Sequence, residues 1–279
     1  MRPAIQLYTV AEQLQNDFEG TLRKLAQLGF REVELAGLGG KHPREIRQLL
    51  ESSGLTCRSG HLIQFWESKI DESIDAAAEM GLEYVVVPCG WKPDVNGIGP
   101  DPEGGPHAFA IAVLNSLTLD DWSCNAELLN RTGEKVRAAG MQLAYHNHNF
   151  EFRELGGICG FDELMRLTDP QLVKLELDPA WAQVAGADPV DLLRKHSRRV
   201  RLVHVRDFAP GYVPTKRLSL ANAPTAAPPG QGIVDFDTLI PNAIEIGVEA
   251  MFVEREPNPH NLDRIAQDIA WLAPRISYA

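Results

Sequence analysis

Residues 17–37 read DFEGTLRKLAQLGFREVELAG and predict a helix, a glycine stop and a strand in direct succession. From Phe18 to Leu28 the apolar residues recur at three- and four-residue spacing, which is typical of a helix with one buried face. Gly29 stands where this helix must end, because glycine readily adopts the left-handed backbone of a helix C-terminus. The run 32–36 is then expected to be the strand that follows the helix.

The same alternation of strand and helix runs through the whole chain. Strict alternation predicts a parallel sheet with right-handed crossovers, and eight such units fit a closed (β/α)8 barrel, a TIM barrel of the α/β class. The expected strands are 4–9, 32–36, 56–62, 84–89, 142–148, 173–178, 201–207 and 250–256. The expected helices are 17–29, 42–54, 69–81, 119–140, 161–167, 189–196, 236–247 and 262–276.

An open, doubly wound sheet is the competing fold, and it usually carries a glycine-rich phosphate loop after its first strand. Residues 9–17 (TVAEQLQND) contain no glycine, so we expect one barrel domain over residues 1–279. Two long segments, 90–117 and 208–232, follow strands and therefore belong to the C-terminal face, where barrel active sites are built. They are either walls of a substrate site or insertions without a role.

Composition and charge exclude several classes of protein. The 279 residues are 44% hydrophobic but contain no run of about 18 apolar residues, so we expect neither disorder nor contact with a membrane. The start of the chain lacks the apolar core of a secretory signal, and the four cysteines include no CxxC pair, which predicts a cytoplasmic protein. A net charge of −11 argues against nucleic acid as a partner.

Polar side chains gather near the ends of the expected strands. Inward positions of a barrel strand are apolar unless they serve chemistry, and residues two apart share a face. A single such residue is better explained as a helix cap or a surface ion pair. Together they would leave several buried charges unpaired, and a divalent cation such as Mn²⁺, Co²⁺, Mg²⁺, Fe²⁺ or Zn²⁺ would neutralise them. These residues are Gln6, Tyr8, Glu34, His61, His146, His148, Glu176, Asp178, His204, Arg206, Glu254 and Glu256.

Several runs of sequence around these residues resemble the xylose isomerase-like TIM-barrel superfamily, the sugar phosphate isomerase/epimerase group. This group also holds ketose 3-epimerases, inosose dehydratase and 3-dehydroshikimate dehydratase. The resemblance extends over essentially the whole chain, and it is specific for the superfamily but not for one reaction. The runs are AYHNHNFEF (144–152), LELDPAW (175–181), LVHVRDF (202–208), GQGIVDF (230–236) and FVERE (252–256).

The resemblance implies one divalent metal ion held by residues at the ends of the fifth to eighth strands. Asp178, His204 and Glu254 match three of the family's ligands directly. The fourth is a glutamate in many relatives, whereas this sequence has His146 at that position and an acid only at Glu151. We favour Glu151 as the fourth ligand, because a third carboxylate makes a harder, oxygen-rich site, and His146 remains the alternative.

The remaining polar residues at this end are assigned to proton transfer and to substrate contacts. Candidate catalytic acids and bases are His148, Glu256 and Glu151, and aromatic side chains are expected to stack on a sugar ring unless they only pack in the core. Candidate substrate-binding residues are His61, Arg206, His146, Glu34, Trp66 and Trp91, with Phe150 as a further stacking aromatic.

The resemblance and the residues together predict a metal-dependent isomerase or epimerase that acts on a keto-sugar or polyol through an enediolate. The alternative is a dehydratase or lyase of a keto-sugar, an inosose or a 3-keto-glycoside in the same family. A non-catalytic sugar-binding barrel and an abasic-site endonuclease are less consistent with the intact ligand residues and the charge of −11. We expect a small carbohydrate substrate, and the family resemblance allows for a homo-oligomer.

Overall fold

The structure is a computed structural model that describes residues 1–63, 69–102, 107–219, 223–258 and 260–276. All eight expected strands are present in it. They are β1 (Ala4–Gln6), β2 (Glu32–Leu35), β3 (Thr56–His61), β4 (Tyr84–Val87), β5 (Gln142–His146), β8 (Val173–Leu177), β9 (Val200–Val205) and β12 (Ala250–Val253). They pair in parallel in the order β1-β12-β9-β8-β5-β4-β3-β2, and β1 pairs with both β12 and β2. This closure confirms the predicted single (β/α)8 barrel.

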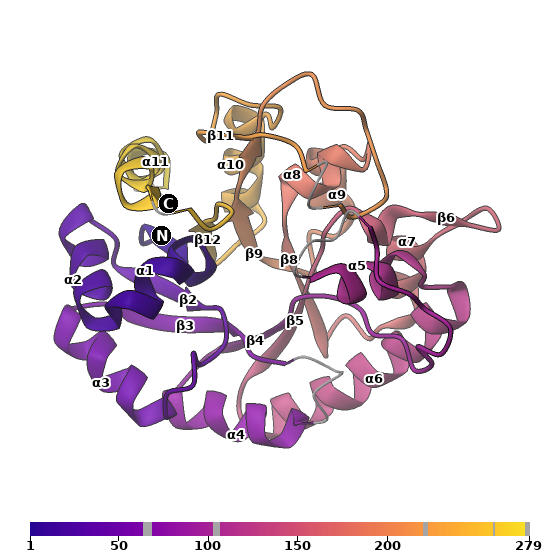
Figure 1. Cartoon of the computed structure of the whole chain (residues 1–279), viewed down its shortest axis with the longest axis horizontal. Coiled ribbons are helices and arrows are strands. Elements are labelled where there is room, and N and C mark those ends of the chain that lie inside the picture. Colours follow the sequence, from indigo (N-terminus) through magenta and orange to yellow (C-terminus); the bar gives the residue numbers. More distant parts are fainter. Residues whose placement is uncertain (64–68, 103–106, 220–222, 259, 277–279) are drawn as a thin grey trace.

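Helices cover the outside of the barrel. They are α1 (Ala11–Asn16), α2 (Phe18–Leu28), α3 (Pro43–Ser53), α4 (Ile70–Met80), α5 (Ala108–Asn115), α6 (Leu119–Ala138), α7 (Gly160–Leu167), α8 (Pro179–Val184), α9 (Pro189–Lys195), α10 (Phe236–Glu245) and α11 (Asn261–Ile276). Figure 1 shows α2, α3, α4 and α6 as an arc outside the strands. All eight expected helices are therefore confirmed, and the additional α1, α5 and α8 follow strands β1, β4 and β8.

Local sequence signals set the ends of these helices. Gly29 and Gly54 directly follow α2 and α3 and have positive φ angles of 108° and 72°, a conformation that favours glycine. Thr118 precedes α6, where its hydroxyl accepts a hydrogen bond from the backbone N–H of Asp121 and the Asp121 carboxylate accepts one from the Thr118 backbone N–H. These caps pair backbone groups that a helix end leaves without partners.

The interior of the barrel is divided into an apolar layer and a polar layer. The apolar layer is a separate buried cluster formed by Ala4, Tyr84, Val86, Ala144, Leu202, Ala250 and Phe252. Two residues further along several of these strands, the inward positions carry polar groups, for example His146 after Ala144 and His204 after Leu202. Because inward positions recur every second residue, the apolar layer supports the polar layer from below.

Two irregularities in strand pairing lie within the polar layer. The register between β2 and β3 shifts between Val33 and Glu34, and the register between β8 and β9 shifts between Leu175 and Glu176. The extra residues are Arg58 on β3 and Arg201 on β9, and such a residue changes the direction of the side chains that follow it on its own strand. Glu34 and Glu176 lie on the regular strands opposite, and both are fully buried.

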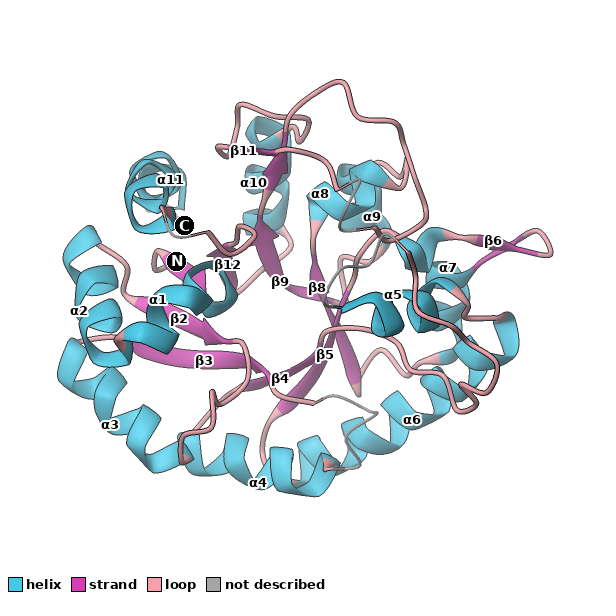
Figure 2. Ribbon diagram, viewed as in Figure 1, coloured by secondary structure: helices cyan, strands magenta, loops and turns pink. Residues whose placement is uncertain are grey.

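Short strands outside the barrel sheet lie in the loops of its C-terminal face. Two short antiparallel pairs are present, β6 (Glu154–Leu155) with β7 (Ile158–Cys159) and β10 (Asp207–Phe208) with β11 (Ala226–Ala227). Figure 2 shows strands in the centre, helices around them, and long loops on the side of β11 and α8. Within the described residues, no helix is both long enough and apolar enough to span a bilayer.

Candidate metal and active site

A cavity of about 430 Å³ opens where the barrel strands end. Its polar lining comes mainly from strand ends, and part of its apolar lining comes from the two long segments, since Ile111 and Leu114 belong to 90–117 and Leu218 to 208–232. Both segments therefore contribute walls to this cavity. The polar lining residues are Tyr8, His61, His107, His146, His148, Arg206, Glu254 and Glu256.

Four buried side chains beside this cavity have the geometry of a metal site. One ligand atom from each of His146, Asp178, His204 and Glu254 lies within 4.8 Å of the others. Two imidazoles and two carboxylates suit divalent ions such as Mn²⁺, Co²⁺, Fe²⁺ and Zn²⁺. Burial raises the pKa of Asp178 to about 6, against the opposing effect of Arg206, so this carboxylate lacks full compensation by the protein alone. The residues present therefore fit a divalent cation.

Arg206 connects this group to the mouth of the cavity. Its guanidinium donates to Asp178 Oδ2 from Nε at 3.1 Å and to Glu256 Oε1 from Nη1 at 2.6 Å, and its Nη2 lies 2.8 Å from Glu254 Oε2. It also lies over the Trp181 ring, 5.6 Å from the centroid. Glu256 in turn accepts a hydrogen bond from the Tyr8 hydroxyl at 3.5 Å. The Arg206 guanidinium thus holds three carboxylates in fixed positions around the cavity.

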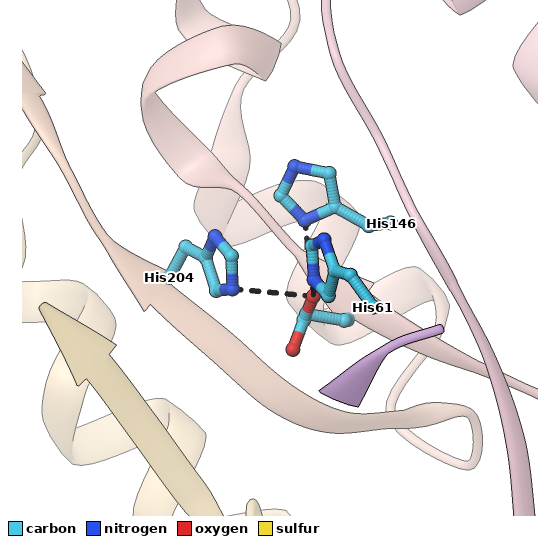
Figure 3. Close-up of side chains that lie close together, drawn as sticks. His61, His146 and His204 are labelled. Atoms are coloured by element: carbon cyan, nitrogen blue, oxygen red, sulfur yellow. Dashed lines mark hydrogen bonds and ion pairs between the residues drawn. The ribbon is translucent and has the colours of Figure 1, made fainter. Parts of the chain in front are cut away.

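A second layer of carboxylates lies beneath the imidazoles. Glu176 Oε2 lies 2.7 Å from His61 Nε2, 3.1 Å from His146 Nδ1 and 3.2 Å from His204 Nε2 (Figure 3). Burial alone raises the pKa of Glu176, but His204 and His61 outweigh it and hold this pKa well below its usual value. Burial and the charge of Glu176 raise the pKa of Glu34 to about 7, so the two carboxyl groups have shifts in opposite directions.

His148 combines accessibility to the cavity with an unpaired ring nitrogen. Burial, followed by the effect of His146, lowers the pKa of His148 well below its usual value, so the ring is neutral at neutral pH. Its Nδ1 is buried and has no hydrogen-bond partner in the described part of the chain. A neutral imidazole of this kind is able to accept a proton from a bound substrate.

Glu151, the favoured fourth ligand, occupies a different environment from the one expected. Its Oε1 accepts a hydrogen bond from the Tyr145 hydroxyl at 3.0 Å, and its Oε2 accepts one from the His148 backbone N–H at 2.9 Å. Because Tyr145 faces the helices, these contacts hold the carboxylate behind β5. Among the described residues Glu151 joins neither group of potential ligands, whereas His146 belongs to both. The geometry therefore favours the alternative ligand, His146.

Other expected substrate contacts lie away from the cavity or outside the described residues. Glu34 is fully buried below it and bonds Gln6, Ser59 and His204. Trp91 packs against the hydrophobic core and is absent from the described cavity lining. Phe150 is buried between His148 and Trp122, a core position. Trp66 lies outside the described residues. The cavity lining does include His61, Arg206 and His146.

Comparison with known families bears on this arrangement. A model of the family described as the xylose isomerase-like TIM barrel matches residues 22–275 of the chain. The chain belongs to the xylose isomerase-like TIM barrel family.

Relatives within the xylose isomerase-like TIM barrel family include enzymes named inosose dehydratase. The protein of that name from Geobacillus kaustophilus is 28% identical in an alignment 254 residues long that covers 85% of this chain and 80% of that protein. The one from Clostridium botulinum strain Alaska E43 is 26% identical, over 88% of this chain and 84% of that protein. A sugar phosphate isomerase/epimerase from Parabacteroides distasonis has the same fold, with a TM-score of 0.74, 23% identity, and coverage of 98% of this chain and 94% of that one.

Two residues of this family member have contacts that sequence reasoning did not assign. Glu176 was grouped with Asp178 on one face of a strand, but only the barrel shows that three imidazoles meet its carboxylate. Trp181 lines the cavity, and its indole Nε1 is buried without a partner among the described residues. The run LELDPAW carries both residues and was the available signal, but their directions depend on strand register and on helix α8.

Proposed function

We propose that this chain is a divalent-metal-dependent dehydratase that removes water from a cyclic keto-polyol of the inosose kind. One observation carries the proposal: a group of two imidazoles and two carboxylates shares a cavity with the neutral, unpaired His148. The similarity to inosose dehydratases over more than four-fifths of the chain supports elimination of water. Isomerisation or epimerisation, the first prediction from the sequence, begins with the same removal of a proton.

In this proposal His146, Asp178, His204 and Glu254 hold the ion. When bound, a divalent cation polarises the substrate carbonyl and makes the neighbouring C–H bond more acidic. Burial and the effect of His204 lower the pKa of His146 to about 4, so His146 is a neutral imidazole with a lone pair for the ion. His204 has a pKa raised well above its usual value, because the carboxylates of Glu176 and Glu254 outweigh its burial. It must therefore give up a proton when the ion binds.

His148 is proposed to carry the proton between substrate atoms. A ring nitrogen of His148 takes the proton from the carbon beside the carbonyl, and the resulting imidazolium gives that proton to the hydroxyl on the next carbon. The C–H and C–O bonds break, a C=C bond forms, and the hydroxyl leaves as water. One side chain can serve both steps because the imidazole is regenerated when water departs.

The rest of the cavity is proposed to orient the substrate. The Arg206 guanidinium is held by three carboxylates and lines the cavity, so it is placed to bind substrate hydroxyls. The unpaired Trp181 Nε1 is a further donor. Ile111, Leu114 and Leu218 form an apolar wall that packs against the C–H face of a ring and excludes water.

Purified protein stripped with EDTA and reloaded with Mn²⁺ or Co²⁺ tests the proposal against a panel of inososes and keto-sugars in deuterated water. We expect a product lighter by one water, detected by mass spectrometry, together with metal-dependent exchange at the carbon beside the carbonyl. Exchange without loss of water would assign the chain to isomerisation or epimerisation instead. Failure to bind any divalent ion would contradict a metal-dependent enzyme of either kind.

A further inference from the structure

Glu176 lies on β8 two residues before the proposed ligand Asp178 and is completely buried. It has contacts with three imidazoles, those of His61, His146 and His204, all through Oε2. Its other oxygen, Oε1, has no partner in the described part of the chain. Glu176 faces the middle of the barrel together with Asp178, because alternate residues of β8 share a face, and the extra residue at the shift between β8 and β9 is Arg201 on β9. A carboxylate in so unusual a position requires a physical explanation.

The contacts of Glu176 and Glu34 distinguish the two nitrogens of each proposed histidine ligand. His146 meets Glu176 through Nδ1, which leaves Nε2 for other partners. His204 meets Glu34 through Nε2 at 2.8 Å, while its Nδ1 lies 2.6 Å from Glu254 Oε2. A neutral imidazole carries one N–H and one lone pair, and in His146 the nitrogen that faces Glu176 takes the N–H. In His204 both nitrogens face carboxylates, and the N–H is assigned to Nε2 because Glu254, beside Nδ1, is itself a proposed ligand. The opposite nitrogen of each ring then has the lone pair that a metal needs.

We propose that Glu176, together with Glu34, is a positioning residue that fixes the tautomers of His146 and His204 and thereby limits the site to one metal ion. The inference rests on the proposed metal centre. Carboxylates that accept the second N–H of histidine ligands fix the orientation of the ring and increase its basicity, and their loss commonly lowers metal affinity by about 10–100-fold. Glu176 serves both rings at once, since its Oε2 lies within 3.2 Å of each.

A competing explanation makes the deep residues a metal site of their own. His61, His146, Glu176 and His204 also have one potential ligand atom each within 4.8 Å of the others. Both groups use His146 and His204, however, and a neutral ring has only one lone pair to offer. Two ions at once would require each neutral ring to lose its remaining N–H proton and become an imidazolate. The single ion therefore belongs to the group with Asp178 and Glu254, and the deep carboxylates hold the N–H groups.

Metal content and Co²⁺ titration of three variants test this inference. Glu176→Gln keeps the size of the side chain but replaces the charge with an amide, and Glu34→Gln does the same for the second carboxylate. Glu32→Gln is the matched control, because Glu32 is also buried on β2 but pairs with Arg58 at the other end of the strand. Elemental analysis gives the number of ions per chain, and the visible absorption of bound Co²⁺ reports both affinity and coordination.

We expect one ion per chain in the wild type, and an unchanged stoichiometry with at least about tenfold weaker Co²⁺ binding and an altered Co²⁺ spectrum in Glu176→Gln. Glu34→Gln should change in the same direction, and Glu32→Gln should match the wild type. Two ions per wild-type chain, one of them lost in Glu176→Gln, would overturn the inference. Wild-type affinity in Glu176→Gln would do so as well.

The test separates this inference from the proposed function. Metal binding by the wild type without any dehydration would contradict the proposed reaction but leave the role of Glu176 intact. Absence of metal binding in the wild type would overturn both. Thermal unfolding in EDTA shows whether Glu176→Gln folds. If it does not, Glu34→Gln replaces it in the comparison, because Gln6 and Ser59 also contact the side chain at position 34.

Discussion

At the scale of single residues, Asp178 performs two structural tasks with its two oxygens. Oδ1 accepts hydrogen bonds from the backbone N–H groups of Ala180 and Trp181 and so caps α8. Oδ2 lies 3.1 Å from Arg206 Nε, on the side of the proposed ligands. A helix cap and a metal ligand, which are competing explanations for a strand-end aspartate, are compatible here. The cap fixes the carboxylate so that its second oxygen lies on the side of the potential ligands.

Glu151 provides a prediction about pH. Burial raises its pKa from 4.5 to about 8, so the folded protein retains a proton that the unfolded chain releases above about pH 4.5. The contribution to stability is full below pH 4.5 and is lost as pH rises through about 8, with an upper limit of roughly 5 kcal/mol. We expect Glu151→Gln to gain stability relative to the metal-free wild type between pH 5.5 and pH 8.5, measured by urea unfolding.

The same variant separates the two candidates for the fourth ligand. Glu151→Gln should bind Co²⁺ as the wild type does, since its carboxylate contacts Tyr145 and the His148 backbone instead of the ligand group. A large loss of Co²⁺ affinity would return Glu151 to the metal site. A stability difference that stays constant with pH would show that the carboxylate is not the group that titrates.

His148 provides a prediction about the rate of the reaction. Replacing it with glutamine keeps a polar side chain but removes the proton acceptor, so we expect kcat to fall by about 10²–10⁴-fold with little change in metal affinity. His196→Gln is the matched control, because His196 is half-buried, also has a pKa lowered by burial, and lies at the end of α9 away from the cavity. Equal rates for the two variants, from steady-state kinetics, would exclude His148 as the base.

At the scale of elements, the glycine motif 230–232 has a structural role. The Asp207 carboxylate accepts hydrogen bonds from the backbone N–H groups of Gly230, Gly232 and Val234, at 2.9–3.2 Å. A Cβ at Gly232 would lie 2.2 Å from Asp207 Oδ1, so only glycine fits this close approach. The N–H groups that another protein would use to bind phosphate are therefore engaged by an internal carboxylate, which ties the end of segment 208–232 to β10.

Asn115 joins the two long segments that form the apolar wall of the cavity. Its Nδ2 donates to the Leu218 carbonyl at 2.8 Å, and its Oδ1 accepts from the Leu218 N–H at 2.9 Å. Asn115→Ala removes both hydrogen bonds, a loss of about 1–3 kcal/mol. Because Leu218 lines the cavity, we expect KM to rise by about tenfold while kcat changes little. Steady-state kinetics with a substrate identified from the panel of inososes and keto-sugars would measure both constants.

A matched control lies between α6 and the end of α7, outside the cavity lining. Asn130 makes the same type of clamp, donating to the Leu167 carbonyl at 3.1 Å and accepting from the Asp169 N–H at 2.8 Å. Asn130→Ala should lower the melting temperature to a similar extent but leave KM unchanged. If both variants shift KM equally, the effect of Asn115 is one of general stability, and the wall has no specific role.

At the scale of the whole molecule, the polar layer leads us to expect that stability depends on metal. Four carboxylates of this layer are at least nine-tenths buried, namely those of Glu34, Glu176, Asp178 and Glu254. The Arg206 guanidinium contacts two of them, Asp178 and Glu254. An ion that binds only the folded state stabilises it, by about 2.7 kcal/mol at a hundredfold excess over Kd. We therefore expect Mn²⁺ or Co²⁺ to raise the melting temperature of EDTA-treated protein by roughly 5–10 °C.

Glu254→Gln is the variant that tests this dependence. It removes one ligand charge and should abolish the rise in melting temperature, while Glu32→Gln should retain it. Glu254 is preferable to His204 for this purpose, because His204 is fully buried and its truncation would also remove an imidazole that contacts both Glu34 and Glu254. An equal rise in Glu254→Gln and the wild type would place the ion elsewhere.

Much of the fold was predictable because its signals are local. The apolar stripe of the helix and the glycine that ends it are contiguous within residues 18–29. Inward pairs such as His204 and Arg206 lie only two residues apart. The additional helix α8 was not predicted, because six residues are too few for a periodic signal. Residues at the strand ends were predictable as a set, since parity alone places them on one face.

The sequence by itself determined the eight-unit barrel, the inward direction of the polar residues and the identity of most groups at the cavity. Only the tertiary structure decided how those groups are paired: Glu151 with Tyr145 behind β5, His146 with the ligand group, and Glu176 with three imidazoles. The physical reason is range. Side-chain parity follows from neighbouring residues along one strand, whereas these contacts depend on the register between strands, including the extra residue of β9 opposite Glu176, and on closure of the barrel.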